Sequence, residues 1–192
     1  MNILVISNDQ YFSSGMLNLL QEEGYNCHAR NFDNLYRNSL NIIAVDYDLV
    51  ILDITLVKNT QNLLPLNGAL TNALFVVDIQ SAFIEDNRCF ISKRNSANEF
   101  IKKIDRYVEF KIPKVNQIEF EALQLSNSGY NMTSISSYLN ITEKSAYRLR
   151  YNLVLKFGFL RYHPLTAAYC ELMFMFFMHQ QPLKISAPQW SG

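Results

Sequence analysis

Short apolar runs alternate with longer stretches of helical spacing along the first 108 residues. Several of these runs are rich in β-branched and aromatic side chains, which favours buried strands. In the intervening stretches apolar positions recur every three or four residues, which predicts amphipathic helices. The strands are expected at residues 3–6, 25–29, 49–52, 73–79 and 89–91. The helices are expected at 8–24 and 96–108, and with a weaker pattern at 32–40 and 54–72.

Strands that are separated by helices pair in parallel through right-handed crossovers, so this half is expected to be an α/β domain. In such sheets the functional side chains collect at the carboxyl ends of the strands. That rule places Ser7, Asn8 and Asp9 near Asp53 and Lys93. A carboxylate beside a lysine fits a phosphorylation site, a metal site or a plain ion pair, and the residues alone leave all three open.

Three helices with polar caps are predicted between residues 116 and 158. Asn116, Asn131 and Thr142 are the expected N-caps, and Glu119 completes a capping box with Asn116. The first helix is expected to bury Ile118 among its apolar residues. Two short helices, a tight connection and a longer polar helix are the layout of a helix-turn-helix.

The third of these helices, about residues 143–157, has two distinct faces. Its predicted core side carries Ala146, Leu149, Leu153 and Phe157. Its other side is basic and aromatic, and long side chains of these types can enter a DNA major groove and read base edges. Flanking cations are better placed for phosphates. The predicted DNA-binding residues are Lys144, Tyr147, Arg148 and Tyr151 on the face, with Arg150 and Lys156 beside it.

Residues 164–178 predict a fourth helix that is apolar on nearly every side. A helix of this kind in a small domain should be amphipathic, so its second apolar side needs a partner. Dimerisation is the favoured interpretation, contact with the first half of the chain is the second, and membrane association is disfavoured because no basic face accompanies the run. The tail 179–192, which contains Trp190, is expected to be irregular.

Composition narrows the class of protein further. The chain has 192 residues, 49% hydrophobic and 18% charged, which suits one large or two small globular domains. Its zero net charge is divided between an acidic first 110 residues and a basic stretch at 111–163, with balances of −4 and +4. A basic segment of this kind suits a polyanion such as nucleic acid.

Several function classes lack support in the sequence. Cys27, Cys89 and Cys170 lie too far apart for a disulfide framework or a CxxC metal motif. The histidines have no ligand-like spacing, and no glycine-rich nucleotide motif is present. The start of the chain has no signal-peptide pattern. We therefore expect a cytoplasmic protein that is neither an enzyme nor a membrane protein, with no cofactor and no metal.

Residues 1–108 resemble the receiver domains of response regulators. The resemblance rests on ILVISNDQYFSSGMLNLL, DLVILDITL and CFISKRNSANEFIKKI. It implies a flavodoxin-like domain with a five-stranded parallel sheet, in which Asp53 matches the phospho-acceptor and Lys93 the family's lysine. Ser7 and Asn8 stand where the family has an acidic pair for Mg²⁺, and neutral oxygens are weak ligands for that ion. The resemblance therefore implies a degenerate receiver, used for dimerisation rather than as a phospho-switch; an unidentified ligand in the same cleft is the third alternative.

Residues 118–158 resemble the DNA-binding domain of the LuxR/FixJ class of transcription regulators, over IEFEALQLSNSGYNMTSISSYLNITEKSAYRLRYNLVLKFG. The resemblance implies an all-α domain of about four helices in which Tyr147, Arg148 and Lys156 face DNA. The expected organisation is a receiver-like domain at 1–108, a linker at 109–115, a helix-turn-helix domain at 116–178 and a tail. The implied partners are double-stranded DNA and either a second copy or a response regulator; a protein that modulates another regulator, and a conventional regulator phosphorylated on Asp53, are the alternatives.

Overall fold

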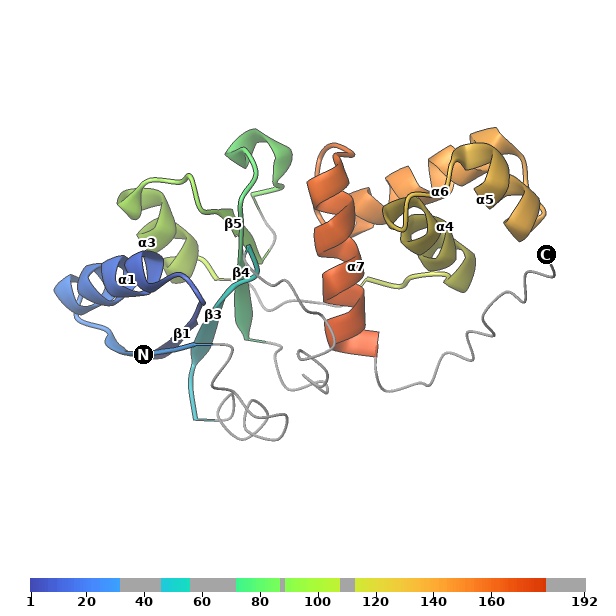
Figure 1. Ribbon diagram of the computed structural model, residues 1–192. Coiled ribbons are helices and arrows are strands. Elements are labelled where there is room, and N and C mark those ends of the chain that lie inside the picture. Colours follow the sequence, from blue (N-terminus) through green and yellow to red (C-terminus); the bar gives the residue numbers. More distant parts are fainter. Residues whose placement is uncertain (32–45, 56–71, 87–88, 108–112, 179–192) are drawn as a thin grey trace.

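The computed structural model describes residues 1–31, 46–55, 72–86, 89–107 and 113–178. An α/β half comes first and four helices follow it (Figure 1). The weakly predicted helices at 32–40 and 54–72, most of the expected linker and the tail with Trp190 lie largely or wholly outside the described residues.

The α/β half is built on a fully parallel sheet with the strand order β2-β1-β3-β4-β5. This confirms the predicted five-stranded parallel sheet, and the expected strand positions are shifted or shortened by only one or two residues. The central strands are buried on both faces, as their continuous apolar sequences require. The strands are β1 (Asn2–Ile6), β2 (Asn26–Arg30), β3 (Leu49–Asp53), β4 (Ala73–Val77) and β5 (Phe90–Ser92).

One face of the sheet is covered by α1 (Gln10–Glu22) and α3 (Ala97–Asp105). Side chains alternate between faces along a strand, so every second strand residue points to this side. Ile3, Val5, Ile51 and Val76 pack there, together with Met16 and Leu20 of α1 and Phe100 and Ile104 of α3. This layer is built from residues of the first half alone.

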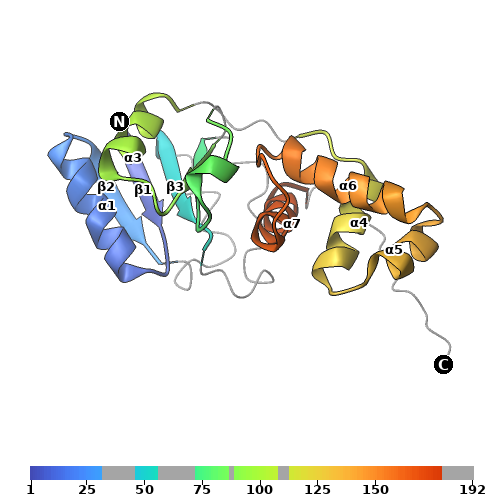
Figure 2. The same cartoon turned by 90° about the horizontal axis from the view of Figure 1, so that it is seen from above.

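The opposite face of the sheet is covered by α7 (Pro164–Met178), which belongs to the second half of the chain. In both views α7 stands between the sheet and the three helices at residues 117–156 (Figures 1 and 2). The alternate strand residues Leu4, Val50, Leu52 and Phe75 share one continuous apolar cluster with buried residues of α7, namely Ala167, Tyr169, Cys170, Leu172, Met173 and Phe174. The second interpretation, contact with the first half of the chain, is therefore confirmed for the buried residues of α7 up to Phe174, and the favoured interpretation as a dimer surface is wrong for those residues.

A short antiparallel bridge also joins the two halves. It pairs Ile84, which follows the 3-10 turn η3 (Ser81–Phe83), with Phe159 in the connection before α7. The Glu85 amide donates to the Gly158 carbonyl at 2.9 Å, and the Leu160 amide donates to the Phe83 carbonyl at 2.8 Å. The Phe159 ring lies 4.6 Å from that of Phe90 on β5, between ring centroids. Backbone hydrogen bonds and ring packing thus connect the sheet edge to the helices.

The remaining helices are α4 (Gln117–Asn127), α5 (Met132–Leu139) and α6 (Glu143–Lys156). All three predicted N-caps are present: Asn116 forms the capping box with Glu119, Asn131 accepts from the Ser134 amide, and Thr142 accepts from the Ser145 amide. Asn140 takes the left-handed conformation, at φ 52°, that turns the chain sharply from α5 into α6. Local capping therefore accounts for where each helix begins.

One expected core position, Ile118, differs in the structure, and Leu149 packs against the small core of α4, α5 and α6 as predicted but is only partly buried. Ile118 is 41% exposed and Leu149 is half-buried, and both line a cavity of about 380 Å³ between the start of α4 and α6. Phe120 of α4 and Val154 of α6 are buried instead. Both join the cluster that contains α7, and the Phe120 ring stacks on Phe174 at 3.7 Å. The sides of α4 and α6 that carry Phe120 and Val154 are buried because α7 packs against them.

We expect Phe159→Ala to lower the free energy of unfolding of the whole chain by about 3–5 kcal/mol, since the ring is fully buried between the two halves. Leu160→Ala is the control, because this neighbouring side chain is 49% exposed and its loss should change stability by less than about 0.5 kcal/mol. Urea unfolding followed by circular dichroism measures both. Two separate transitions, only one of them moved by Phe159→Ala, would contradict a shared core.

Candidate nucleic-acid interface and acidic cluster

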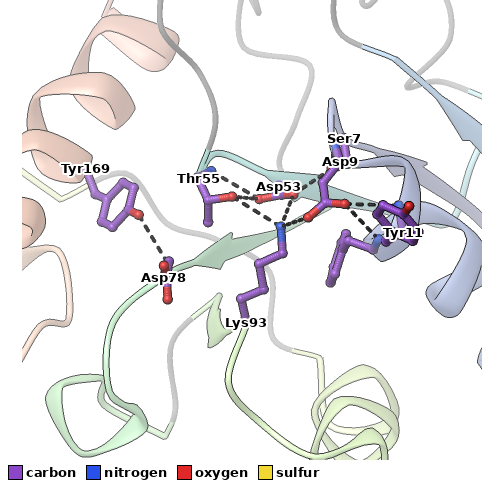
Figure 3. Close-up of polar contacts among 9 residues, drawn as sticks. Ser7, Asp9, Tyr11, Asp53, Thr55, Asp78, Lys93 and Tyr169 are labelled. Carbon is purple, nitrogen blue, oxygen red and sulfur yellow. Dashed lines mark hydrogen bonds and ion pairs between the residues drawn. The ribbon is translucent and has the colours of Figure 1, made fainter.

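The carboxylate of Asp53 lies at the carboxyl end of β3, fully buried, with both oxygens engaged (Figure 3). Its Oδ1 accepts from the backbone amide and the hydroxyl of Thr55, at 3.1 and 2.6 Å. Its Oδ2 accepts from the Ser7 hydroxyl at 2.5 Å and from Lys93 Nζ at 3.0 Å. A buried charge with four donors is well compensated.

Lys93 joins Asp53 to a second carboxylate, that of Asp9. Its Nζ lies 2.8 Å from Asp9 Oδ2 and 4.8 Å from the centre of the Phe12 ring. Asp9 is also the N-cap of α1, since its Oδ1 accepts from the amides of Tyr11 and Phe12. The structure therefore brings Ser7, Asp9, Asp53 and Lys93 together as the sequence predicts, and Asp9 reaches the lysine although it stands one position beyond the expected acidic pair.

The charges of this cluster shift the pKa values of Asp9 and Lys93. The hydrogen bond from Lys93, with help from the Phe12 amide, holds the pKa of Asp9 below its usual range. Burial works against a charged Lys93, yet the hydrogen bonds from its ammonium to Asp9 and Asp53 outweigh burial and raise its pKa. Each group is therefore held in its charged form, which is the chemistry of an ion pair.

The same contacts make the cluster a poor fit for the Mg²⁺ that a receiver-like fold implies. Mg²⁺ requires several oxygen ligands in near-octahedral geometry. Here a lysine ammonium lies between the two carboxylates, and neither Asp53 oxygen is left without a donor. Across the described ranges, no three His, Cys, Asp or Glu side chains are grouped so that they could hold a metal. Of the three sequence interpretations, the geometry matches the ion pair.

A second candidate site is the outer face of α6. Lys144, Tyr147, Arg148 and Tyr151 are all exposed there, with Tyr147 at 51% and Tyr151 at 43%. Leu155 extends the same row and is 37% exposed. Within the part of the chain that the structure describes, neither Lys144 nor Arg148 donates a hydrogen bond to another side chain. The predicted reading face is therefore accessible and carries two uncommitted cations.

The other two predicted DNA contacts are engaged within the protein. Arg150 lies between the rings of Tyr147 and Tyr162, at 4.9 and 4.1 Å from their centres, and donates to the Ser126 hydroxyl of α4. Lys156 Nζ contacts both carboxylate oxygens of Glu119, at 2.6 and 2.7 Å. These side chains tie α6 to α4 and to the connection before α7. Helical spacing showed that they flank the reading face, but not that partners lie beside them.

Sequence reasoning missed Tyr169 of α7, which is 7% exposed. It lies on the α7 side of the acidic cluster, as we call Asp9, Asp53 and Lys93 (Figure 3). The backbone amide of Asp78, directly after β4, donates to the Tyr169 hydroxyl at 3.1 Å. The apolar sequence of α7 shows that the helix needs a partner but does not identify the partner. Thr55, which donates two hydrogen bonds to Asp53, was missed too. The sequence reasoning took Asp53 as the functional residue at the end of this strand and did not consider the residues after it.

Comparisons with known proteins support the fold. No protein-family model matches the chain, and no curated protein matches it. Among solved structures it is similar to RcsB from Salmonella enterica serovar Typhimurium bound to a promoter with the phosphomimetic BeF3⁻, at 12% identity and a TM-score of 0.51, over 90% of this chain and 98% of that chain. A second RcsB–promoter structure is 13% identical with a TM-score of 0.47, over 89% and 98%. At 12% identity, the likeness to the first of these structures shows a shared fold.

Lowering the pH should destabilise the protein in part through Asp9. Folding lowers the pKa of Asp9. Its contribution to the free energy of unfolding is therefore complete above the ordinary pKa of an aspartate, and it is lost as the pH falls through the lower pKa of the folded state. Asp9→Asn should remove at most about 1 kcal/mol at pH 7, because the pair is partly exposed, and should flatten the decline between about pH 5 and 3. Asp105→Asn, which removes an exposed carboxylate outside the cluster, is the control. Urea midpoints across this pH range test it; an unchanged slope in Asp9→Asn would show that the pair contributes nothing.

Proposed function

We propose that this protein is a DNA-binding transcription regulator whose α6 enters the major groove of double-stranded DNA. The observation that carries the proposal is the accessible face of α6, where Lys144, Tyr147, Arg148 and Tyr151 follow a short helix and a tight turn. Arg and Lys pair with guanine edges, and Tyr contacts bases or phosphates. The α/β half then serves as the platform that holds α7 and, through it, α4 and α6.

We further propose that regulation does not require phosphorylation of Asp53. The donors around both of its oxygens, and the ion pair of Lys93 with Asp9, support this. A phosphoryl group on Asp53 would displace at least one buried hydrogen bond of Ser7 or Thr55. Lys93 already offsets part of the negative charge of Asp9 and Asp53 without a metal.

Few free cations on α6 favour action as a dimer. Each phosphate that a protein neutralises contributes about 0.9 to the slope of log affinity against log salt. With Arg150 and Lys156 engaged internally, one copy offers chiefly Lys144 and Arg148 on this face, which predicts weak binding by a single copy. A homodimer, or a heterodimer with a response regulator, doubles the contacts and sets two reading helices about one DNA turn apart, roughly 34 Å.

The same observation favours a second candidate: a protein that binds another regulator, with DNA contact secondary. Selection of genomic DNA fragments by the purified protein separates the two. Recovery of a shared, roughly two-fold-symmetric site supports a self-sufficient homodimer. Weak, sequence-blind and strongly salt-sensitive binding supports a partner-dependent protein.

Arg148→Ala and Arg150→Ala form a matched test of the α6 face. Arg148→Ala should weaken binding to the selected fragment about 10-fold, the size of one lost base contact, while unfolding stays within about 0.5 kcal/mol of the parent. Arg150→Ala should instead lower stability by about 1–3 kcal/mol, because the guanidinium packs between two rings. Fluorescence anisotropy and urea unfolding measure the two effects. Unchanged DNA affinity in Arg148→Ala would mean that the reading face is assigned to the wrong side of α6.

Treatment with a small-molecule phosphodonor and Mg²⁺ tests the conventional alternative. We expect well under one phosphate per chain, measured by intact-mass spectrometry, because Asp53 is buried and saturated with donors. Asp53→Ala is the control for labelling elsewhere. Stoichiometric phosphate that disappears in Asp53→Ala would support a phospho-switch and contradict our proposal.

A further inference from the structure

A cavity of about 380 Å³ lies between the start of α4 and α6, beside the reading face. Cavities that hold small molecules commonly measure about 300–1,000 Å³, so a small organic molecule fits in this one. Aliphatic and polar side chains both line it, namely Ile118, Ile141 and Leu149, and Asn116, Ser145, Arg148 and Asn152. An apolar floor with a few polar groups around it is the usual composition of a small-molecule site.

The aliphatic side chains of the cavity are incompletely covered by the protein. Ile118 is 41% exposed in the first turn of α4. Ile141 and Leu149 pack against the small core of α4, α5 and α6, but both are only partly buried. The small core is therefore open toward the cavity, and an apolar ligand body placed there would remove aliphatic surface from water.

The polar side of the cavity is positively charged. Among the described residues that line it, Arg148 is the single charged side chain and no carboxylate is present. Ser145 and Asn152 stand three residues before and four residues after Arg148, so the three side chains lie on one side of α6. A guanidinium binds a carboxylate through two parallel N–H···O bonds, which fix its position and its orientation. A ligand that carries a carboxylate therefore matches the charge of this cavity.

We propose that the cavity binds a small aliphatic carboxylate, which pairs with Arg148 and lays its apolar body on the three aliphatic side chains. The ligand competes with DNA, because the Arg148 guanidinium cannot hold a carboxylate and a guanine edge at the same time. Each of the two therefore weakens the binding of the other by the same factor. The competition rests on the proposed function of α6, whereas the binding of the carboxylate does not. Such a ligand supplies a signal that does not need phosphorylation of Asp53.

Titration of the full-length chain without DNA, followed by NMR shifts of the backbone amides of residues 145–152, tests the site. Cyclohexanecarboxylate is the probe, and cyclohexanecarboxamide has the same shape without the charge. We expect a dissociation constant of about 1 mM or less for the carboxylate, and binding of the amide that is about 10-fold weaker. Arg148→Gln should weaken the carboxylate about 10-fold and leave the amide unchanged. Equal binding of the two probes, no binding of either, or carboxylate binding that Arg148→Gln does not alter would overturn the site.

Ile118→Thr and Leu160→Thr form a matched pair for the aliphatic side of the cavity. Ile118 is 41% exposed and lines the cavity, whereas Leu160 is 49% exposed and lies outside the lining. Because both positions are exposed, neither change should unfold the protein. Ile118→Thr should weaken the carboxylate about 5-fold through lost apolar contact, and Leu160→Thr should leave its affinity unchanged. Equal effects of the two changes would contradict binding in this cavity.

Fluorescence anisotropy on the DNA fragment that the protein selects measures the competition. At about ten times its dissociation constant, the carboxylate should weaken DNA binding about 10-fold in the parent and about 3-fold in Ile118→Thr. Sodium chloride at the same concentration is the control, because salt alone weakens binding to DNA. Unchanged DNA affinity in the parent would overturn the competition and leave the proposed function standing. A parent that binds no DNA would contradict the proposed function, and the titration without DNA would still decide the site.

Discussion

The burial of α7 against the sheet is the interaction on which the rest of the structure depends. A parallel sheet with an apolar sequence on both faces requires two covering layers. Among the described residues, α1 and α3 cover one face and α7 covers the other. Because α7 also packs on α4 and α6, the same buried side chains position the face of α6 that we propose for DNA. The burial of apolar side chains thus fixes the position of the Asp53 site relative to that of the outer face of α6.

Electrostatics has a different role at each site. In the acidic cluster the opposite charges satisfy one another, so the site holds its own geometry and offers little to an incoming ion. On α6 the cations divide into two kinds: Lys156 and Arg150 fasten helices together, and Lys144 and Arg148 remain exposed. The net positive charge of the second half therefore exceeds the positive charge that is accessible to a polyanion, because Arg150 and Lys156 contact other residues of the protein.

Local features and the contacts that the rule for parallel sheets fixes were predictable from the sequence, and the contacts between the two halves of the chain were not. The strands, the three N-caps and the meeting of Ser7, Asp9, Asp53 and Lys93 all follow from nearest-neighbour patterns and from the rule for parallel sheets. The docking of α7, the Ile84–Phe159 bridge and the Tyr169 contact join residues more than seventy positions apart. An apolar helix indicates only that some surface must cover it, and no local pattern distinguishes its own sheet from a second copy. The prediction that Ile118 is buried failed for the same reason, because the location of α7 decides which side of α4 faces inward.

The apolar core that the sheet shares with α4, α6 and α7 affects whether the two halves of the chain can be expressed separately or exchanged. Regulators with a sensing part and a DNA-reading part are commonly treated as exchangeable modules joined by a linker. A fragment that ends before α4 would lose the α7 side chains that pack on the described strands and the Phe159 backbone that pairs with Ile84, and the apolar surface so exposed would favour aggregation. The helical fragment would in turn expose the side of α7 that the sheet covers. The apolar cluster that contains α7 thus draws on described residues from both sides of the predicted linker at 109–115.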